Sequence, residues 1–540
     1  MLSLPAMAGR AFLILRLGII LTSVAFMVTA AVLLPHFLRA QTGPDQVATP
    51  QLSFPAGKYP TQRNVVVTCA TAGATIHYTL DGTEPTASSP GISSGQSILV
   101  SQNSSLKAKG VLSGLLPSET ISATYAITGQ VATGSDYTVA LRSDRTVWAW
   151  GYNEYGQLGN NTTIDSVTPV QVNGLTEVVA VAAGYGHSLA VKSDGTVWAW
   201  GGNASGELGN NTTIDRPTPL QVAGLTDVVA VAAGNSHSLA LKSDGTVWAW
   251  GANWYGQLGN NTTAGSLTPV QVNGLTNVVA VAAGGGHSMA LKSDGSVWAW
   301  GDNGSGQLGN NTTIESRAAV QVMGLTDVVA VAAGSDHSLA VKSGGSVWAW
   351  GGNWSGQLGN NTTTDSRTAV HVIGLTDVVA VAAGYGHSLA VKGDGGVWAW
   401  GANWDGQLGN STTTDSSTPA QVLGLIDIVA VAAGYDHSLA VKNGGSISAW
   451  GANWYGQLGN QSTSGSVAPA QVSGLSNVDA VVAGDYHSLA LKGDGSVWAW
   501  GANWSGQLGN NTAADSALPV QVNGLTSVTA LSAGGGHLWH

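Results

Sequence analysis

A 50-residue repeat runs through the sequence from residue 131 to its end, and it limits the possible folds more than any other feature. The phrase Trp-Ala-Trp-Gly begins at residues 148, 198, 248, 298, 348, 398 and 498, with Ser448-Ala449-Trp450 in the remaining copy. Gly-Gln-Leu-Gly follows in each copy, once as Gly206-Glu207-Leu208-Gly209. A fixed period of this length is the signature of repeated units that stack on their neighbours. We therefore expect one supersecondary unit in eight copies.

Each unit contains four short apolar runs of the length that is typical of β-strands. In the second unit they are residues 178–183, 188–192, 196–200 and 219–222. Ser193-Asp194-Gly195 is a hairpin signal between two of them. Four strands per repeat predict the blade of a β-propeller and hence an all-β fold.

The constant residues of the unit have structural interpretations. Side chains alternate along a strand, so the two indoles of Trp-Ala-Trp lie on one side, where they can fill the gap between blades. One histidine also recurs per unit. Equivalent positions in different blades are spread around a ring, whereas a metal needs several ligands at one point, so we expect hydrogen bonds that tie the strands of each blade together. These residues are His187, His237, His287, His337, His387, His437, His487 and His537.

The phrases Gly-x-x-His-Ser-Leu-Ala and Trp-Ala-Trp-Gly-x-Asn-x-x-Gly-Gln-Leu-Gly resemble the regulator of chromosome condensation repeat family, over residues 131–540. The resemblance implies a propeller of four-stranded blades, usually seven. Eight units are present here, so either the ring has eight blades, which we favour, or one unit lies outside a seven-bladed ring. The well-formed inner-strand phrase at Val528–Gly534 indicates that the chain end supplies the inner strand of the first blade.

The N-terminal 40 residues have the pattern of an export signal. Arg10 and Arg16 precede an apolar run from Leu17 to Leu34, which is the order of a signal peptide or of an uncleaved signal anchor. Both alternatives place the rest of the chain in an extracellular, periplasmic or cell-surface location. The net charge is −11 and no Lys/Arg cluster is present, so we expect no nucleic-acid partner. Membrane contact is expected only through an uncleaved N-terminal segment.

A second, smaller domain precedes the repeats. Residues 41–50 are polar and predict a linker, and residues 51–128 contain short strands separated by Gly, Pro and Ser turns, which predict a small β-sandwich. The stretch from Ile76 to Thr86 resembles the hairpin of the chitobiase/β-hexosaminidase C-terminal domain family. That resemblance implies a non-catalytic accessory module.

The units differ from one another mainly in two loops, and these carry the candidate binding residues. In a four-stranded meander, the loop between strands one and two (the inner loop) and the loop between strands three and four (the outer loop) lie at the same end. Aromatic residues gather there, and such residues are enriched at binding hot spots. The alternative interpretation is that the rings only cover neighbouring loops. The candidates are Tyr155, Tyr185, Trp254, Tyr255, Trp354, Tyr385, Trp404, Tyr435, Trp454, Tyr455, Tyr486 and Trp504.

No constellation of catalytic residues can be assembled from the sequence. Gly91-Ile92-Ser93-Ser94-Gly95 matches the nucleophile-elbow pattern by letter, but it lies in a Ser-rich loop without the strand–turn–helix context that the motif needs. We expect a non-enzymatic binding protein with no cofactor and no metal. An extracellular protein partner is favoured, with the propeller acting as an enzyme inhibitor or surface adhesion module, and a carbohydrate-binding propeller is the alternative.

Overall fold

The computed structural model describes residues 46–52, 57–59, 63–100, 104–127, 132–133 and 136–531, and these form β-strands and turns without a helix. The chain divides after Tyr125 into a small N-terminal domain and a large C-terminal one. Within the described ranges, no helix is long and apolar enough to cross a membrane. The predicted signal or anchor segment at residues 1–40 lies outside them.

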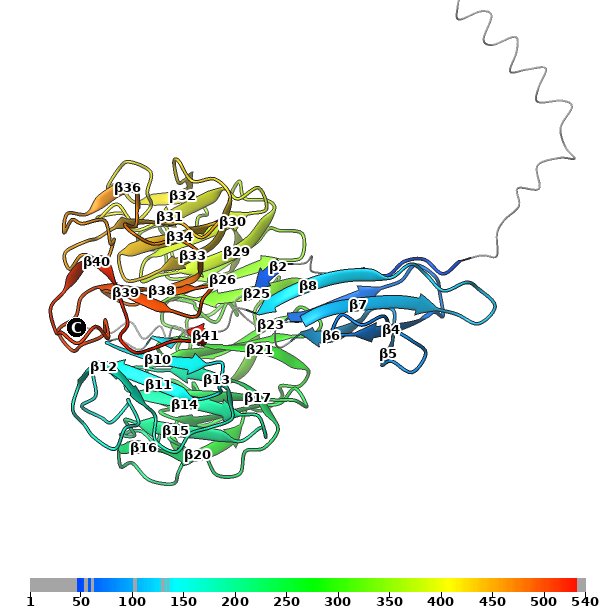
Figure 1. The fold of residues 1–540 in the computed structure, drawn as a ribbon, viewed down its shortest axis with the longest axis horizontal. Helices are drawn as coiled ribbons and strands as arrows, with labels where there is room; N and C mark the ends of the chain where they lie inside the picture. The colour runs from blue at the N-terminus through cyan, green and yellow to red at the C-terminus, as the bar shows by residue number, and fades with distance from the viewer. Residues whose placement is uncertain are drawn as a thin grey trace, which may run out of the picture. The chain divides into compact units, whose positions relative to one another are not determined.

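The N-terminal domain consists of two antiparallel sheets, with strand orders β1-β3-β6 and β2-β8-β7-β4-β5 (Figure 1). Burial alternates residue by residue along β7, the pattern of a strand with one face in a core. Val65, Ile76, Leu106 and Tyr125 are fully buried there, and Val47, within the predicted linker, is 2% exposed and donates to Leu116 O. The strands are β1 (Gln51–Leu52), β2 (Gly57–Tyr59), β3 (Arg63–Thr68), β4 (Thr75–Thr79), β5 (Gly91–Ser93), β6 (Gln96–Val100), β7 (Ser104–Val111) and β8 (Ile121–Ile127).

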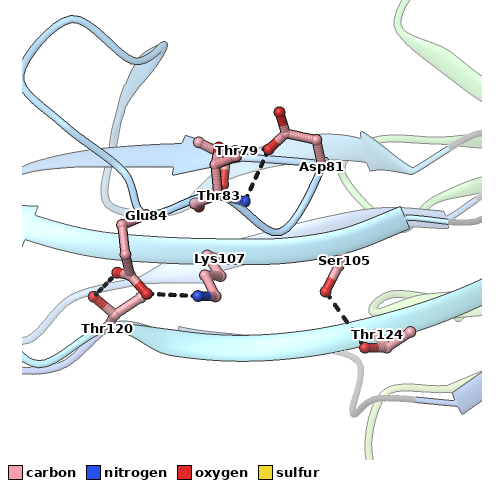
Figure 2. Close-up of polar contacts among 8 residues, drawn as sticks. All are labelled: Thr79, Asp81, Thr83, Glu84, Ser105, Lys107, Thr120 and Thr124. Carbon is pink, nitrogen blue, oxygen red and sulfur yellow. Dashed lines mark hydrogen bonds and ion pairs between the residues drawn. The ribbon is translucent and has the colours of Figure 1, made fainter.

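The hairpin motif of this domain is held by its own polar side chains (Figure 2). The backbone and hydroxyl of Thr83 both donate to Asp81 Oδ1, at 3.0 and 2.6 Å, which closes an Asx turn. Glu84 then accepts from Lys107 Nζ on β7 at 2.5 Å and from the Thr120 hydroxyl at 3.0 Å. The Asp-Gly-Thr-Glu sequence therefore fixes the turn after β4 against the sheet.

The C-terminal domain contains eight antiparallel blades of four strands each, which confirms the predicted all-β propeller. Blade 1 takes three of its four strands from the start of the domain and the fourth from its end, and the other seven blades are consecutive meanders. Blade 2 contains β13 (Val178–Ala183), β14 (His187–Lys192), β15 (Val197–Gly201) and β16 (Arg216–Gln221), so the fourth strand begins earlier than the sequence indicated. Blades 3 and 4 contain β17 (Val228–Ala233), β18 (His237–Lys242), β19 (Val247–Gly251), β20 (Ser266–Gln271), β21 (Val278–Ala283), β22 (His287–Lys292), β23 (Val297–Gly301) and β24 (Ser316–Gln321).

The second half of the ring repeats the same pattern. Blades 5 and 6 contain β25 (Val328–Ala333), β26 (His337–Lys342), β27 (Val347–Gly351), β28 (Ser366–His371), β29 (Val378–Ala383), β30 (His387–Lys392), β31 (Val397–Gly401) and β32 (Ser416–Gln421). Blades 7 and 8 contain β33 (Ile428–Ala433), β34 (His437–Lys442), β35 (Ile447–Gly451), β36 (Ser466–Gln471), β37 (Val478–Ala483), β38 (His487–Lys492), β39 (Val497–Gly501) and β40 (Ser516–Gln521).

Blade 1 closes the ring with strands from both ends of the domain. Its order is β12 (Ser166–Gln171), β11 (Val147–Gly151), β10 (Tyr137–Arg142) and β41 (Val528–Leu531). In Figure 1 the red β41 lies beside the cyan β10. The predicted closure is therefore confirmed, with one addition: β9 (Ala132–Thr133) pairs with the first half of β10. Ser532–Gly534, which the sequence assigned to the same strand, lie outside the described residues.

Two contacts that join consecutive blades recur between blades 8 and 1. Trp150 Nε1 donates to Gln507 O at 2.9 Å, as Trp200 Nε1 donates to Gln157 O at 2.8 Å. Asn511 N donates to Val167 O at 2.8 Å across the same junction. All eight units therefore belong to one ring, and the seven-bladed alternative is not adopted.

The tryptophan pairs fill the junctions between blades as predicted. Trp250 of blade 3 is fully buried against Leu208 and Val222 of blade 2, and Trp248 packs on the same cluster. The first tryptophan of each pair is only partly buried, and a strand-two cation covers it in several blades, such as Lys192 at 5.5 Å from the Trp198 ring. Burial of one aromatic side chain contributes about 1.5–3 kcal/mol, so these junctions account for much of the stability of the ring.

The recurring histidines connect neighbouring blades, and the expectation that they tie the strands of one blade together was wrong in this respect. His187 Nε2 lies 3.0 Å from Ser238 Oγ of the next blade, and His237 Nε2 lies 2.9 Å from Ser288 Oγ. Ser238 Oγ donates in turn to Glu207 O at 2.9 Å. The histidines make hydrogen bonds, as expected, but their partners lie in the next blade rather than in the same one. His537 lies outside the described residues.

Candidate binding face

The variable loops converge because of the strand order. The first and second strands of each blade are joined by the inner loop, and the third and fourth by the outer loop, so both emerge at the same end of the meander. A bond between blades demonstrates this: Trp404 Nε1 in the outer loop of blade 6 donates to Asp436 Oδ1 in the inner loop of blade 7 at 3.0 Å. The two loop sets therefore form one surface, which we call the loop face.

A buried asparagine gives each outer loop a fixed shape. Asn153 accepts a hydrogen bond from Leu158 N at 2.9 Å, and its amide donates to Ile164 O at 2.9 Å. Asp165 Oδ1 accepts from Asn153 N at 2.8 Å. The same bonds recur around Asn403, where Asp415 takes the place of Asp165. The loop aspartates thus hold the loop, and the aromatic side chains project from a rigid scaffold.

Six of the candidate aromatic residues form a continuous chain of rings across blades 5 to 8. Tyr385 and Tyr435 are stacked, with centroids 4.4 Å apart and planes 15° apart. Tyr435 then approaches Tyr486 at 5.9 Å. We call the whole set the aromatic arc; its members are Trp354, Tyr385, Tyr435, Tyr455, Tyr486 and Trp504.

The rings of the arc are only partly exposed to solvent. Trp354 is 43% exposed and Trp504 is 44% exposed, whereas Tyr385, Tyr435 and Tyr486 are half-buried. The structural interpretation, that rings cover loops, holds for part of each side chain. The remaining exposed aromatic surface is contiguous, which is the property that marks binding sites on protein surfaces.

The other candidates lie outside the arc. Tyr155 packs on the next blade, with its ring 3.0 Å from the position that a Cβ on Gly186 would occupy, and Tyr185 is half-buried. Trp404 is bound to Asp436 as described above. The remaining three are exposed or largely so, namely Trp254 at 64%, Tyr255 at 41% and Trp454 at 55%.

Carboxylates from the inner loops accompany the tyrosines. Burial, with a smaller effect of the nearby Asp485 carboxylate, raises the pKa of Asp136 to about 6. Burial and the charge of Asp485, followed by Asp436, also raise the pKa of Tyr486. These groups come from blades 7, 8 and 1, so their inner loops meet near the ring centre. The face presents aromatic rings with negative charge between them.

The side chains of the loop face are of the kinds that bind a partner. No group of three or more His, Cys, Asp or Glu side chains suited to a metal occurs in the part of the chain that the structure describes. Burial lowers the pKa of His187 to about 4 and that of His237 to about 3, so these rings are neutral and enclosed. Stacking, hydrogen bonding and Coulomb attraction are the interactions that the loop face can offer.

Sequence reasoning missed the glutamine of each Gly-Gln-Leu-Gly phrase. Gln407 Nε2 donates to Asp436 Oδ1 at 3.1 Å, and Gln507 Nε2 donates to Asp136 Oδ1 at 3.3 Å. These glutamines are nearly invariant within the chain, so they looked purely structural. The available signal was the residue that stands at the corresponding point of the next inner loop, which is Asp in three copies, Gly in three, Ser at 236 and Tyr at 486.

Comparison with known proteins agrees with this architecture. A model of the RCC1-like domain matches residues 202–539, and models of the regulator of chromosome condensation (RCC1) repeat match residues 144–191, 130–157 and 178–207. A model of the chitobiase/beta-hexosaminidase C-terminal domain matches residues 54–124. Both resemblances drawn from the sequence are thus confirmed.

Two solved structures and one curated protein are similar to this chain. Prp20p from Saccharomyces cerevisiae is 24% identical with a TM-score of 0.53, covering 65% of this chain and 92% of its own. Human WBSCR16 is 25% identical with a TM-score of 0.53, covering 64% of this chain and 98% of its own.

The curated protein is the ultraviolet-B receptor UVR8 of Arabidopsis thaliana, which is 34% identical over 58 residues, 11% of this chain and 13% of that receptor. This short match says little about function. The RCC1-like domain model, in contrast, extends over residues 202–539, which is more than half of the chain. The chain belongs to the family of RCC1-like domain proteins.

Proposed function

We propose that this chain is an exported, non-catalytic binding protein that recognises a protein partner through the loop face of its propeller. The observation that carries the proposal is the contiguous, partly exposed aromatic arc with carboxylates beside it. Aromatic side chains held in place dominate the binding energy of protein interfaces because they bury large areas at little entropic cost.

The related structures support a protein partner. Yeast Prp20p was described together with its binding to Gsp1p and histones, and yeast RCC1 (Prp20) was crystallised with Kap60. The export signal pattern at Arg10 to Leu34 supports an extracellular, periplasmic or cell-surface location. An enzyme inhibitor or a surface adhesion module fits both features.

The test removes exposed indoles from the loop face. Trp354, Trp404 and Trp454 are 43%, 46% and 55% exposed, so changing all three to Ala should leave the propeller folded. We expect the variant to lose capture of its partner in a pull-down from culture medium. The matched control changes Met323, Ile373 and Leu423 to Ala, which are 52%, 47% and 56% exposed and follow the fourth strands. Equal capture by both variants would refute the loop face as the binding surface.

Carbohydrate binding is the second candidate, because the N-terminal domain matches a chitobiase/beta-hexosaminidase module and flat aromatic rings stack on sugars. A glycan array with the same two variants distinguishes it from protein binding. Retention of a glycan by the unmodified protein and not by the triple Trp→Ala variant would favour this candidate. If neither assay retains anything at micromolar concentration, the binding proposal is wrong.

A further inference from the structure

One kind of blade junction on the loop face is built around a carboxylate. Between blades 6 and 7, Trp404 Nε1 and Gln407 Nε2 both donate to Asp436 Oδ1, at 3.0 and 3.1 Å. Asp436 is only 5% exposed. Between blades 8 and 1, the corresponding carboxylate is Asp136, which accepts from Gln507 Nε2 at 3.3 Å. The Trp504 side chain also hydrogen-bonds to Asp136, so both junctions consist of an indole, an amide and an acid that the next blade supplies.

The junction between blades 5 and 6 has the two donors and lacks the acid. Trp354 and Gln357 correspond to Trp404 and Gln407, but the next inner loop has Gly386 where Asp436 stands. Gln357 is fully buried, and its Nε2 has no hydrogen-bond partner among the described residues. Trp354 Nε1 lies 3.9 Å from the position of a Cβ on Gly386. A buried donor without an acceptor is energetically unfavourable, because it has lost its bonds to water and gained none in return.

Other junctions with a glycine at this point are filled by a tyrosine ring. At Gly286, the Tyr255 ring lies 3.3 Å from the Cβ position, and at Gly186 the Tyr155 ring lies 3.0 Å from it. The residue that corresponds to these tyrosines before Gly386 is Ser355, which is too small to take that place. At Gly386, the three heavy atoms nearest to the Cβ position are Ala402 Cβ at 3.2 Å and atoms of the Trp354 and Trp404 indoles at 3.9 Å, and no tyrosine ring is among them.

We propose that the junction of Trp354, Gln357 and Gly386 is a subsite that takes a carboxylate oxygen from an acidic side chain of the partner. The carboxylate would occupy the place that Asp436 occupies one blade further on, and it would accept from the indole and the buried amide. Tyr385, whose ring centroid lies 6.4 Å from that of Trp354, borders the subsite. The exposed Trp354 side chain moves to admit the group. This inference rests on the proposed function, because it assigns one contact of the same loop face.

The experiment uses sodium acetate as the probe and the full-length protein labelled with 5-fluorotryptophan. Trp354→Phe identifies the fluorine resonance of Trp354 by its loss. We expect acetate at millimolar concentration to shift that resonance in a saturable way, since a single small group binds weakly. Acetamide and methyl glucoside are the other arms. A shift with acetamide equal to that with acetate would overturn the carboxylate assignment, and no saturable shift with acetate would overturn the subsite.

Gly386→Asp tests the same idea from within the chain. Gly386 has no positive φ, so Asp can be placed there, with a modest adjustment of Ala402, whose Cβ lies 3.2 Å from the new Cβ. We expect this variant to lose the acetate response and to melt at a higher temperature. The control is Gly285→Asp, which adds the same charge to the inner loop of blade 4, where the nearest atom is 3.4 Å away. It should keep the response.

A Gly386→Asp variant that responds to acetate as the unmodified protein does would contradict the subsite. Failure of the subsite and failure of the proposed function are distinguishable, because the acetate titration needs no partner. Capture of a partner that depends on the three indoles, combined with no acetate response, would leave the loop face intact as the binding surface and refute only the carboxylate contact.

Discussion

A single serine hydroxyl joins two blades, and its bonds also determine the state of the histidine next to it. Ser238 Oγ donates its only proton to Glu207 O at 2.9 Å, so it can only accept from His187. The proton of that neutral imidazole is therefore on Nε2. Trp250 Nε1 donates to the same Glu207 O. One carbonyl, one hydroxyl, one imidazole and one indole thus form a network across each such junction.

Ser238→Ala should destabilise the propeller by about 1–3 kcal/mol, because it leaves the Nε2–H of a fully buried His187 without an acceptor. Denaturant unfolding of the two proteins measures the difference. The chain contains its own control: at the corresponding junction, Ser338 Oγ and His287 Nε2 are buried and have no hydrogen-bond partner among the residues that the structure describes. Ser338→Ala should therefore change the free energy of unfolding only a little. Equal losses from the two variants would show that the network adds no stability.

The sequence could predict that the histidines are structural, and it could not predict their partners. Because the period is 50 residues, the serine of the same blade and the serine of the next blade both lie at a constant spacing from each histidine. Sequence spacing therefore cannot tell which of the two is the partner. Only the packing of blades shows that His187 reaches Ser238. The same limit applies to Gly386, which resembles any other loop glycine in the sequence. Only the structure shows that Gln357 in the preceding blade is buried with no acceptor for its Nε2 among the described residues.

At the scale of strands, closure of blade 1 is the feature that turns a stack of repeats into a ring. β41 pairs with β10 at Ala140 to Arg142, and β9 pairs with it at Thr138 and Val139. The sequence predicted the C-terminal contribution because Val528–Gly534 keeps the inner-strand phrase. The N-terminal contribution was not predictable, since a two-residue strand has no periodicity. A propeller without these strands would expose an unpaired edge.

Ending the chain at Ser527 should open the ring, because it removes β41 and leaves half of β10 unpaired. We expect a lower melting temperature and concentration-dependent association through the free edge, measured by calorimetry and by sedimentation. A chain that ends after Leu531 keeps β41 and is the control. If the shorter chain melts with the control and stays monomeric, β41 does not close the ring.

The folded propeller buries histidines in their neutral form, and its free energy of unfolding therefore depends on pH. Burial lowers the pKa to about 4 for His187, His287 and His487, and to about 3 for His237 and His437. The unfolded chain, with pKa values near 6.5, binds more protons as the pH falls. The stabilisation is therefore complete above about pH 6.5 and is lost towards about pH 4, by about 1.4 kcal/mol per histidine and pH unit.

Asp136 acts in the opposite direction. Its pKa rises from 3.8 to about 6 on folding. The folded state is therefore stabilised relative to the unfolded chain as the pH falls from about 6 to about 4. One carboxyl cannot offset five histidines. We therefore expect the unfolding midpoint in denaturant to fall steeply from pH 7 to pH 5, and to recover when the pH is raised again. A midpoint that stays constant over this range would mean that the histidines are protonated without unfolding, and that the junctions between blades admit water.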